Sequence, residues 1–465
     1  METLRRITKS NVALNIIRAV CLAVVILCSV FYVGEYTRYT APWKVILMDG
    51  AFLIALNVPI LLIYMLRKPD FKVKGLLIAT LCSIAVTATV FFLVNIIVNK
   101  TVDNTFSCYA GLAIIWLISA VTVFLQKPLS KMNFKKILIV SGALSMAFIL
   151  TFTATVLGLV VSTRVSKGVV PTADDLQWLK DNGKVYSRVV VFGVDGAGDY
   201  FSKTETPNFD RIFADGSVTH TAMSQFPTVS AQNWGSMMHG VRCSKHKLTN
   251  GIASEKDYTD TEYPSFFKVY AERHPSAVMC SVVNWGAINK GIIEPDIPGM
   301  TKIYAGNVYD GNEGSYGVDK EVAKQVVGFI QTNDPDIMYM QFDSVDGAGH
   351  DYGYGSDEFA LACRRIDQCI GMIYDAYLAK GWLQDTLFVF IADHGHELTG
   401  GHGSNNKTVR YVTCAVAGGL GNVIKGTPGR VVTQDIAAIV TYALGDTLYE
   451  SWEARVPYNI FTTLA

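Results

Sequence analysis

Long apolar stretches separated by short basic loops occupy the first 165 residues of the chain. Five stretches reach or approach the roughly 17–25 residues that a helix needs to cross the hydrocarbon core of a bilayer. They are Ile16–Val33, Val45–Leu66, Gly75–Val98, Tyr109–Leu125 and Ile137–Ser162. A buried helix of a soluble bundle can contain one such stretch, but five in succession predict an all-α transmembrane domain of five helices over residues 1–165.

The basic residues of the connecting loops predict how these helices are oriented. On one side, the N-terminus with the start of the first stretch and two loops carry Arg5, Arg6, Lys9, Arg18, Arg67, Lys68, Lys72, Lys74, Lys127, Lys131, Lys135 and Lys136, whereas the opposite loops carry Arg38, Lys44 and Lys100. By the positive-inside rule the N-terminus is cytoplasmic, and five crossings place everything after Ser162 outside the cytoplasm. We therefore expect an integral protein of the plasma membrane with an extracellular or periplasmic C-terminal domain. Asp49, near the outer end of the second stretch, either has a function there or reaches headgroup water.

From about residue 166 the pattern changes to short β-branched runs that alternate with longer helical patterns. The strand-like runs are Arg188–Gly196, Asp336–Asp343, Thr386–Asp393 and Val409–Gly419. Helical periodicity is found at Lys320–Gln331, Asp357–Gly381 and Gln434–Gly445. This alternation predicts one α/β domain over residues 166–465, in which helices cover both faces of a mostly parallel sheet.

The composition agrees with a membrane region followed by a folded domain. Half of the residues are hydrophobic and 17% are charged, and the apolar excess lies before residue 165. Because of the five apolar stretches we expect the lipid bilayer as a partner. The formal net charge is zero, so we expect no nucleic-acid-binding surface. Five cysteines of the second half have no zinc-type CxxC spacing, and their odd number leaves any disulfide pairing open.

Three of the predicted strands end in an aspartate, namely Asp195, Asp343 and Asp393. In open sheets of this kind, binding sites form beyond the carboxyl ends of the strands. A single aspartate at such a place is often only a turn former or a helix cap. Three of them, with histidines close by, favour a site.

Histidine is scarce in the chain but concentrated near these aspartates. Eight histidines are present, and three of them lie in the segment IADHGHELTGGHGS, residues 391–404. The candidate metal ligands are Asp195, Asp346, His350, Asp393, His394 and His402. Imidazole and carboxylate groups together suit zinc or manganese, and six ligands exceed one tetrahedral zinc site. The pattern predicts two divalent metal ions, zinc first and manganese as the alternative, of the kind that clamp a phosphoryl group.

The segment FPTVSAQNWGSMMHGV, residues 226–241, offers a nucleophile next to a predicted helix. It carries hydroxyl groups at Thr228 and Ser230, just before an apolar helical stretch. The N–H groups of a helix N-terminus bind phosphate, and a hydroxyl that touches a metal ion there becomes a usable nucleophile. Either residue is also compatible with a simple N-cap.

Five motifs occur in the order used by the alkaline phosphatase superfamily: VVFGVDGAG, TPNFDRIFADG, FPTVSAQNW, DGAGHDYG and ADHGHELTGGHG. They most resemble those of its type I phosphodiesterase/nucleotide pyrophosphatase branch. The resemblance covers nearly all of the chain from Arg188 onward and implies an alkaline phosphatase-like fold.

The same resemblance implies roles for individual residues. One ion is expected at Asp195, Asp393 and His394, in contact with Ser230, and the other at Asp346, His350 and His402. Ser230 lies ten residues before Gly240, as the nucleophile of the branch does, and Thr228 is the alternative nucleophile. Asn233 matches an asparagine three residues after the family nucleophile. Asn250 resembles an asparagine that helps to hold a phosphate oxygen, although it is one residue out of register, and both are expected at the substrate.

Two departures from the branch bear on the reaction. Only seven residues separate His394 from His402, whereas nucleotide pyrophosphatases insert a long segment there. The short form resembles enzymes that transfer ethanolamine phosphate onto glycolipid anchors. Five predicted spans before an outer domain also resemble bacterial phosphoethanolamine transferases and lipoteichoic acid synthases, although those proteins carry different nucleophile motifs.

These observations predict a membrane-anchored, two-metal phosphodiesterase or phosphatase that acts on a phosphoester through a covalent phospho-Ser/Thr intermediate. The alternative is a transferase that moves phosphoethanolamine or phosphoglycerol from a phospholipid to a lipid or glycan hydroxyl. A third class, a scaffold with an inactive domain, would lack bound metal. The CxPxR-type motif of sulfatases is absent.

Overall fold

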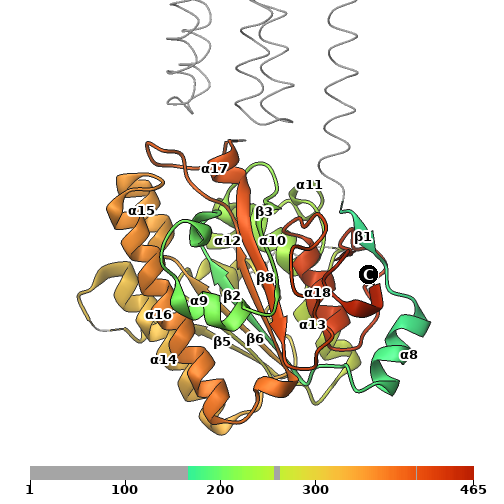
Figure 1. The fold of residues 1–465 in the computed structure, drawn as a ribbon. Coiled ribbons are helices and arrows are strands. Elements are labelled where there is room, and N and C mark those ends of the chain that lie inside the picture. The colour runs from blue at the N-terminus through green and yellow to red at the C-terminus, as the bar shows by residue number, and fades with distance from the viewer. Residues whose placement is uncertain (1–165, 256–261, 310, 405, 465) are drawn as a thin grey trace, which may run out of the picture. The chain divides into compact units, whose positions relative to one another are not determined.

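A computed structural model describes residues 166–464 of the chain, except 256–261, 310 and 405 (Figure 1). The five predicted membrane stretches and Asp49 lie outside the described residues. Within the described part, no helix combines the length and the apolar character that are needed to span a bilayer. The described residues belong to one compact unit.

A seven-stranded sheet forms the centre of this unit (Figure 1). In spatial order its strands are β3 (Ser217–Met223), β8 (Tyr411–Gly418), β7 (Thr386–Ala392), β2 (Arg188–Val194), β6 (Ile337–Phe342), β4 (Met279–Val283) and β5 (Met300–Tyr304). The run from β7 to β5 is parallel, whereas β8 pairs antiparallel with both of its neighbours. A separate two-stranded sheet joins β1 (Gly168–Val169) and β9 (Val456–Pro457).

Helices pack on both faces of the sheet (Figure 1). One group contains α9 (Pro207–Phe213), α14 (Gly314–Thr332), α15 (Ser344–Tyr352) and α16 (Asp357–Ala379). The other contains α10 (Ser230–His239), α11 (Cys243–His246), α12 (Asn250–Glu255), α13 (Phe266–Arg273) and α18 (Asp435–Ala443). The remaining elements are α8 (Ala173–Asp181), α17 (Lys407–Arg410), η1 (Tyr200–Ser202), η2 (Ile288–Ile292), η3 (Ala305–Asn307), η4 (Leu383–Asp385) and η5 (Thr462–Leu464).

The predicted α/β class is confirmed, and the sheet is mixed. The central strands β2, β6 and β7 are buried at every residue, because helices cover both of their faces. This burial explains why their sequences are continuous apolar runs. No strand was predicted at β3, because its sequence SVTHTAM is mostly polar and lacks a β-branched apolar run; β3 lies at the edge of the sheet and is partly exposed.

The register of the three central strands brings their carboxyl ends together. Val194, the last residue of β2, pairs with Phe342 of β6 on one side and with Ala392 of β7 on the other. The residue after each strand is an aspartate. The fold therefore collects three carboxyl groups at one edge of the sheet, as the sequence predicted.

Candidate active site and metal centre

His394 lies at the centre of the first predicted ligand group. Its Nε2 atom is 3.5 Å from Asp195 Oδ1, 3.3 Å from Asp393 Oδ2 and 3.2 Å from Ser230 Oγ. In a tetrahedral zinc site with bonds of about 2.0–2.1 Å, neighbouring ligand atoms are about 3.3 Å apart. The three distances are close to this value, so each of the three oxygens lies at a ligand-to-ligand spacing from His394 Nε2. Ligand atoms of Asp195, His394 and Asp346 also lie within 4.8 Å of one another.

The hydrogen bonds of the two carboxylates support this fit. Asp195 Oδ2 accepts from Trp234 Nε1 at 3.0 Å and from Gln341 Nε2 at 3.1 Å. Asp393 Oδ1 accepts from the backbone N–H groups of Gly196 and His394 at 3.0 and 2.8 Å. Their other oxygens are buried and have no hydrogen-bond partner, and these are the oxygens that face His394 Nε2. Buried unpaired carboxylate oxygens are costly, and a divalent cation compensates for that cost.

Asp346 lies at the centre of the second predicted group. Asp346 Oδ2 is 3.4 Å from His350 Nε2, and Asp346 Oδ1 is 3.8 Å from His402 Nε2. The Nε2 atoms of His350 and His402 are 3.2 Å apart. Asp346 also has an oxygen within 4.8 Å of ligand atoms of Asp195 and His394, so it lies between the two groups.

Backbone carbonyl groups hold the imidazoles so that Nε2 faces the centre. His394 Nδ1 donates to the carbonyl oxygen of Gly395 at 3.2 Å, and His402 Nδ1 donates to that of Thr228 at 2.9 Å. A carbonyl oxygen only accepts, so Nδ1 carries the proton in both rings. The neutral rings therefore direct the Nε2 lone pair toward the carboxylates, as metal-ligating histidines do.

Burial and mutual charge shift the pKa values of the first group. Burial, together with the neighbouring carboxylates, raises the pKa of Asp195 well above its usual range, and burial raises that of Asp393 likewise. Burial and the nearby His402 ring lower the pKa of His394 well below its usual value. His394 therefore stays neutral near pH 7, which metal ligation requires.

Asp346 has the opposite shift, although burial alone would raise its pKa. The imidazoles of His350 and His396 hold the pKa of Asp346 well below its usual range. The hydrogen-bonded Asp346 carboxylate in turn raises the pKa of His350.

Ser230 is the first residue of α10, beside the first ligand group. The N-cap residue Val229 makes no side-chain hydrogen bond to this helix. A helix N-terminus can bind an anion through its unpaired N–H groups, and that of α10 lies at the Ser230 hydroxyl. Asn250 Oδ1 accepts from the Ala231 N–H at 2.8 Å, so Asn250 lies beside Ser230 and caps an N–H group of the first turn.

The Thr228 hydroxyl, by contrast, is bonded on both sides and fully buried. Thr228 Oγ1 donates to the Ser404 carbonyl oxygen at 2.7 Å and accepts from the Gly403 N–H at 3.0 Å. These bonds tie the start of α10 to the loop that carries His402. The geometry favours a structural role for Thr228 and leaves Ser230 as the nucleophile candidate.

Asn233 is also fully buried, one turn into α10. Its Oδ1 accepts from the Gln225 N–H at 2.6 Å and from Thr433 Oγ1 at 3.2 Å. Its Nδ2 donates to the carbonyl oxygens of Gln225 and Val229 at 3.2 Å each. Both ends of the amide are thus used within the protein, and this geometry favours a bracing role over the predicted substrate contact.

One histidine of the cluster was missed by the sequence reasoning. His396 has ligand atoms grouped with those of Asp346, His350 and His402. The available signal was its place in the histidine-rich segment, two residues after His394.

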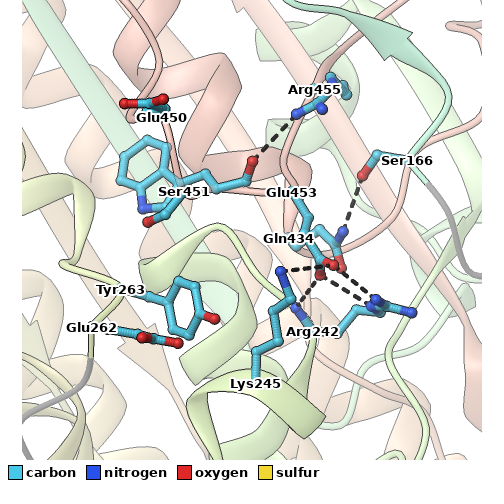
Figure 2. A pocket seen from close by; sticks show the side chains of 11 residues that line it. Ser166, Arg242, Lys245, Glu262, Tyr263, Gln434, Glu450, Ser451, Glu453 and Arg455 are labelled. Atoms are coloured by element: carbon cyan, nitrogen blue, oxygen red, sulfur yellow. Dashed lines mark hydrogen bonds and ion pairs between the residues drawn. The ribbon is translucent and has the colours of Figure 1, made fainter.

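A cavity of about 600 Å³ lies elsewhere, beyond the C-terminal end of α10 (Figure 2). Arg242 and Lys245 line it, and both pair with Glu453, at 2.8 and 3.2 Å. None of the Asp, His or Ser residues of the ligand groups lines this cavity. It is therefore separate from the cluster at the strand ends.

Part of this chain is similar in sequence to known proteins. It is 24% identical over 228 residues to GPI ethanolamine phosphate transferase 2 of Aspergillus fumigatus, a match that spans 48% of this chain and 29% of the relative. The chain thus covers less than a third of that relative's length.

Two solved structures are also similar at low identity. One is murine ectonucleotide pyrophosphatase/phosphodiesterase 5 in complex with AMP (12% identity, TM-score 0.43, 59% of this chain and 97% of that one). The other is a protein of the alkaline phosphatase superfamily from Vibrio parahaemolyticus (16% identity, TM-score 0.44, 58% and 69%).

The family described as type I phosphodiesterase/nucleotide pyrophosphatase matches residues 189–439, which is more than half of the chain. The matched region begins in β2 and ends in α18, so it includes all six predicted metal ligands and Ser230. The chain therefore belongs to the type I phosphodiesterase/nucleotide pyrophosphatase family.

Proposed function

We propose that the protein is a membrane-anchored phosphodiesterase that cleaves phosphoesters outside the cytoplasm through a covalent phosphoserine at Ser230. The observation that carries this proposal is the position of Ser230 Oγ, 3.2 Å from His394 Nε2. The same nitrogen faces the unpaired oxygens of Asp195 and Asp393. A hydroxyl in such surroundings is activated for attack on phosphorus.

Asp195, Asp393 and His394 would hold one divalent cation, and Asp346, His350 and His402 the other, with zinc as the preferred ion. When bound, such cations neutralise charge on phosphoryl oxygens and lower the pKa of a contacting hydroxyl or water. The donor set of carboxylate and imidazole groups suits zinc or manganese better than magnesium or calcium.

The reaction divides into two displacements at phosphorus. Ser230 Oγ attacks, loses its proton to solvent and forms a P–O bond, while the bond from phosphorus to the leaving alcohol breaks. N–H groups at the start of α10 and the side chain of Asn250 hold the phosphoryl oxygens. Water then attacks phosphorus, the Ser230 ester bond breaks, and the serine hydroxyl is restored.

A second candidate reaction replaces this water with the hydroxyl of a lipid or glycan. Two observations favour it: the short interval between His394 and His402, and the similarity to a GPI ethanolamine phosphate transferase. Five predicted membrane helices are also more than a tether requires, which suits a phospholipid donor. Both reactions share the phosphoserine and differ only in the acceptor.

The nucleophile is tested with Ser230→Ala and the matched control Ser244→Ala, because Ser244 is exposed on α11. The full chain in detergent is supplied with zinc and bis-p-nitrophenyl phosphate. We expect turnover to fall by roughly 10³-fold or more in Ser230→Ala and to stay unchanged in the control. Full activity in Ser230→Ala would falsify the assignment.

The acceptor is tested with labelled phosphatidylethanolamine in vesicles. Release of diacylglycerol together with a labelled lipid or glycan product supports the transferase. Rapid cleavage of nucleotide or aryl diesters without diacylglycerol release supports the hydrolase.

A further inference from the structure

His396 is fully buried between α15 and the end of β2. A Cβ atom at Gly349 of α15 would lie 2.4 Å from its ring atom Cγ, and one at Gly196 would lie 2.5 Å from Cε1. Phe359 contacts the same ring edge-to-face, with ring centroids 6.0 Å apart. Two glycines thus make room for an imidazole that packing holds in one orientation.

The two nitrogens of this ring connect the two ligand groups. Nδ1 lies 3.1 Å from the carbonyl oxygen of Gly196, the residue that follows Asp195. Nε2 lies 3.1 Å from Asp346 Oδ1, and both atoms are buried without a hydrogen-bond partner. A single side chain therefore spans the distance between the Asp195 group and the Asp346 group.

Burial separates His396 from the other two histidines around Asp346. The side chain of His350 is 49% exposed and that of His402 is 11% exposed, whereas that of His396 is 0% exposed. Asp346 Oδ2 is directed toward His350, at 3.4 Å, while Oδ1 is directed toward His396, at 3.1 Å. His396 thus lies behind the carboxylate, on the side away from solvent.

We propose that His396 is a positioning residue, which holds the Asp346 carboxylate for the cation bound with His350 and His402 and sets its distance from the Asp195 group. The inference rests on the two-cation site of the proposed function. Partners that orient a ligating carboxylate typically change metal affinity by about 10–100-fold when they are replaced. Loss of a ligand itself removes the ion.

The test measures zinc affinity of the full chain by competition with a chromophoric chelator. We compare the wild type with His396→Leu, His396→Gln, His350→Ala and His220→Ala. His220 lies outside the cluster and bonds Thr413 Oγ1 at 2.9 Å, so its variant is the matched control.

We expect two zinc ions per chain in the wild type and in His220→Ala. One of the two should bind about 10–100-fold more weakly in His396→Leu, whereas His350→Ala should lose that ion. His396→Gln keeps a side-chain amide that can reach Asp346, so it should recover most of the affinity. Gly349→Ala, which crowds the ring but keeps every ligand, should weaken the same ion.

Wild-type zinc affinity in His396→Leu overturns the inference, because His396 then only fills space. Complete loss of one ion in both His396 variants also overturns it, because His396 is then itself a ligand. The proposed function fails separately, through retained turnover in Ser230→Ala. The zinc affinity of the His396 variants tests the role of His396 without any measurement of activity.

Discussion

Trp234 Nε1 donates a hydrogen bond of 3.0 Å to Asp195 Oδ2, and this bond turns the other carboxylate oxygen toward His394. The indole is fully buried in α10 and lies against Gly193 of β2, where a Cβ atom would come within 2.8 Å of the ring. A core aromatic residue thus orients a candidate metal ligand, and the helix that carries it also begins with Ser230.

Trp234→Phe removes this donor while it keeps most of the apolar volume. We expect zinc affinity at the Asp195 group to fall by about 10–100-fold, since an outer hydrogen bond to a ligand is lost. Stability should fall by on the order of 1–3 kcal/mol. Trp178→Phe is the control, because Trp178 is 42% exposed on α8. Equal zinc affinity in the two variants would show that the bond has no influence on the ion.

Thr228→Val tests whether this hydroxyl is structural. The substitution leaves the Ser404 carbonyl and the Gly403 N–H, both partly buried, without their partner, at a cost of about 1 kcal/mol for each hydrogen bond lost. We expect a lower free energy of unfolding in urea, but continued labelling of the protein by a radioactive phosphodiester. Thr228→Ser should behave as the wild type. If labelling disappears in Thr228→Val and persists in Ser230→Ala, the nucleophile is Thr228.

A change of charge at Asn250 tests whether the phosphate group of the substrate binds beside this residue. Asn250→Ala removes both the Ala231 contact and the amide donor, whereas Asn250→Asp keeps an acceptor for Ala231 and adds a negative charge. We expect kcat/KM for an aryl phosphodiester to fall by about 10-fold or more in Asn250→Ala, and further in Asn250→Asp, because the new charge repels the phosphate. Added salt should reduce the difference in kcat/KM between the two variants, because it screens the repulsion between the new carboxylate and the phosphate. A faster Asp variant would place the phosphate elsewhere.

Asp319 of α14 predicts a pH dependence of stability. Its carboxylate accepts from Asn284 Nδ2 at 2.7 Å and from the Ser344 N–H at 2.9 Å, and so holds the start of α15, the helix that carries Asp346. Burial raises the pKa of Asp319 to about 6, despite these hydrogen bonds. A raised carboxyl pKa means that the folded state holds the proton more tightly than the unfolded state does. The contribution of Asp319 to the free energy of unfolding is therefore full below about pH 4 and is lost as the pH rises through 6.

We therefore expect the Asp319 contribution to fall by on the order of 2 kcal/mol between pH 4 and pH 7. Urea unfolding of the zinc-loaded protein at several pH values measures this. Asp319→Asn does not titrate, so its stability should depend less steeply on pH over the same interval, even though its absolute stability is lower. Parallel pH profiles for the two proteins would contradict the assignment.

Much of the site could be predicted because strand ends can be read locally. The β-branched runs before Asp195 and Asp393 match β2 and β7 nearly to the residue. Parallel pairing places the carboxyl ends of neighbouring strands at the same edge of the sheet. The aspartates that follow these strands therefore lie close together, regardless of the structure of the segments that connect the strands. The order and direction of β8 were not readable, since antiparallel pairing depends on where a long connection returns.

The roles of Thr228, Asn233 and His396 depended on contacts that spacing does not reveal. Thr228 and Ser230 are two residues apart and chemically alike, but only one hydroxyl is taken by a backbone carbonyl 176 positions away. His396 differs from His394 only by the atoms that surround it. Burial and hydrogen-bond partners, which decide whether a polar group is available, arise only when distant segments pack.

The amino-acid sequence by itself determined the family, the alternation of strands and helices, and the supply of carboxylate and imidazole groups, because these follow from local pattern and residue type. It also predicts five membrane helices, which stay a prediction. Only the tertiary structure decided which oxygen of each aspartate lacks a partner, which hydroxyl lies beside His394 and which histidine lies behind Asp346. The physical reason is that the reactivity of a polar atom depends on its hydrogen-bond partners and its burial. Both are determined by the packing of segments that are distant in the sequence.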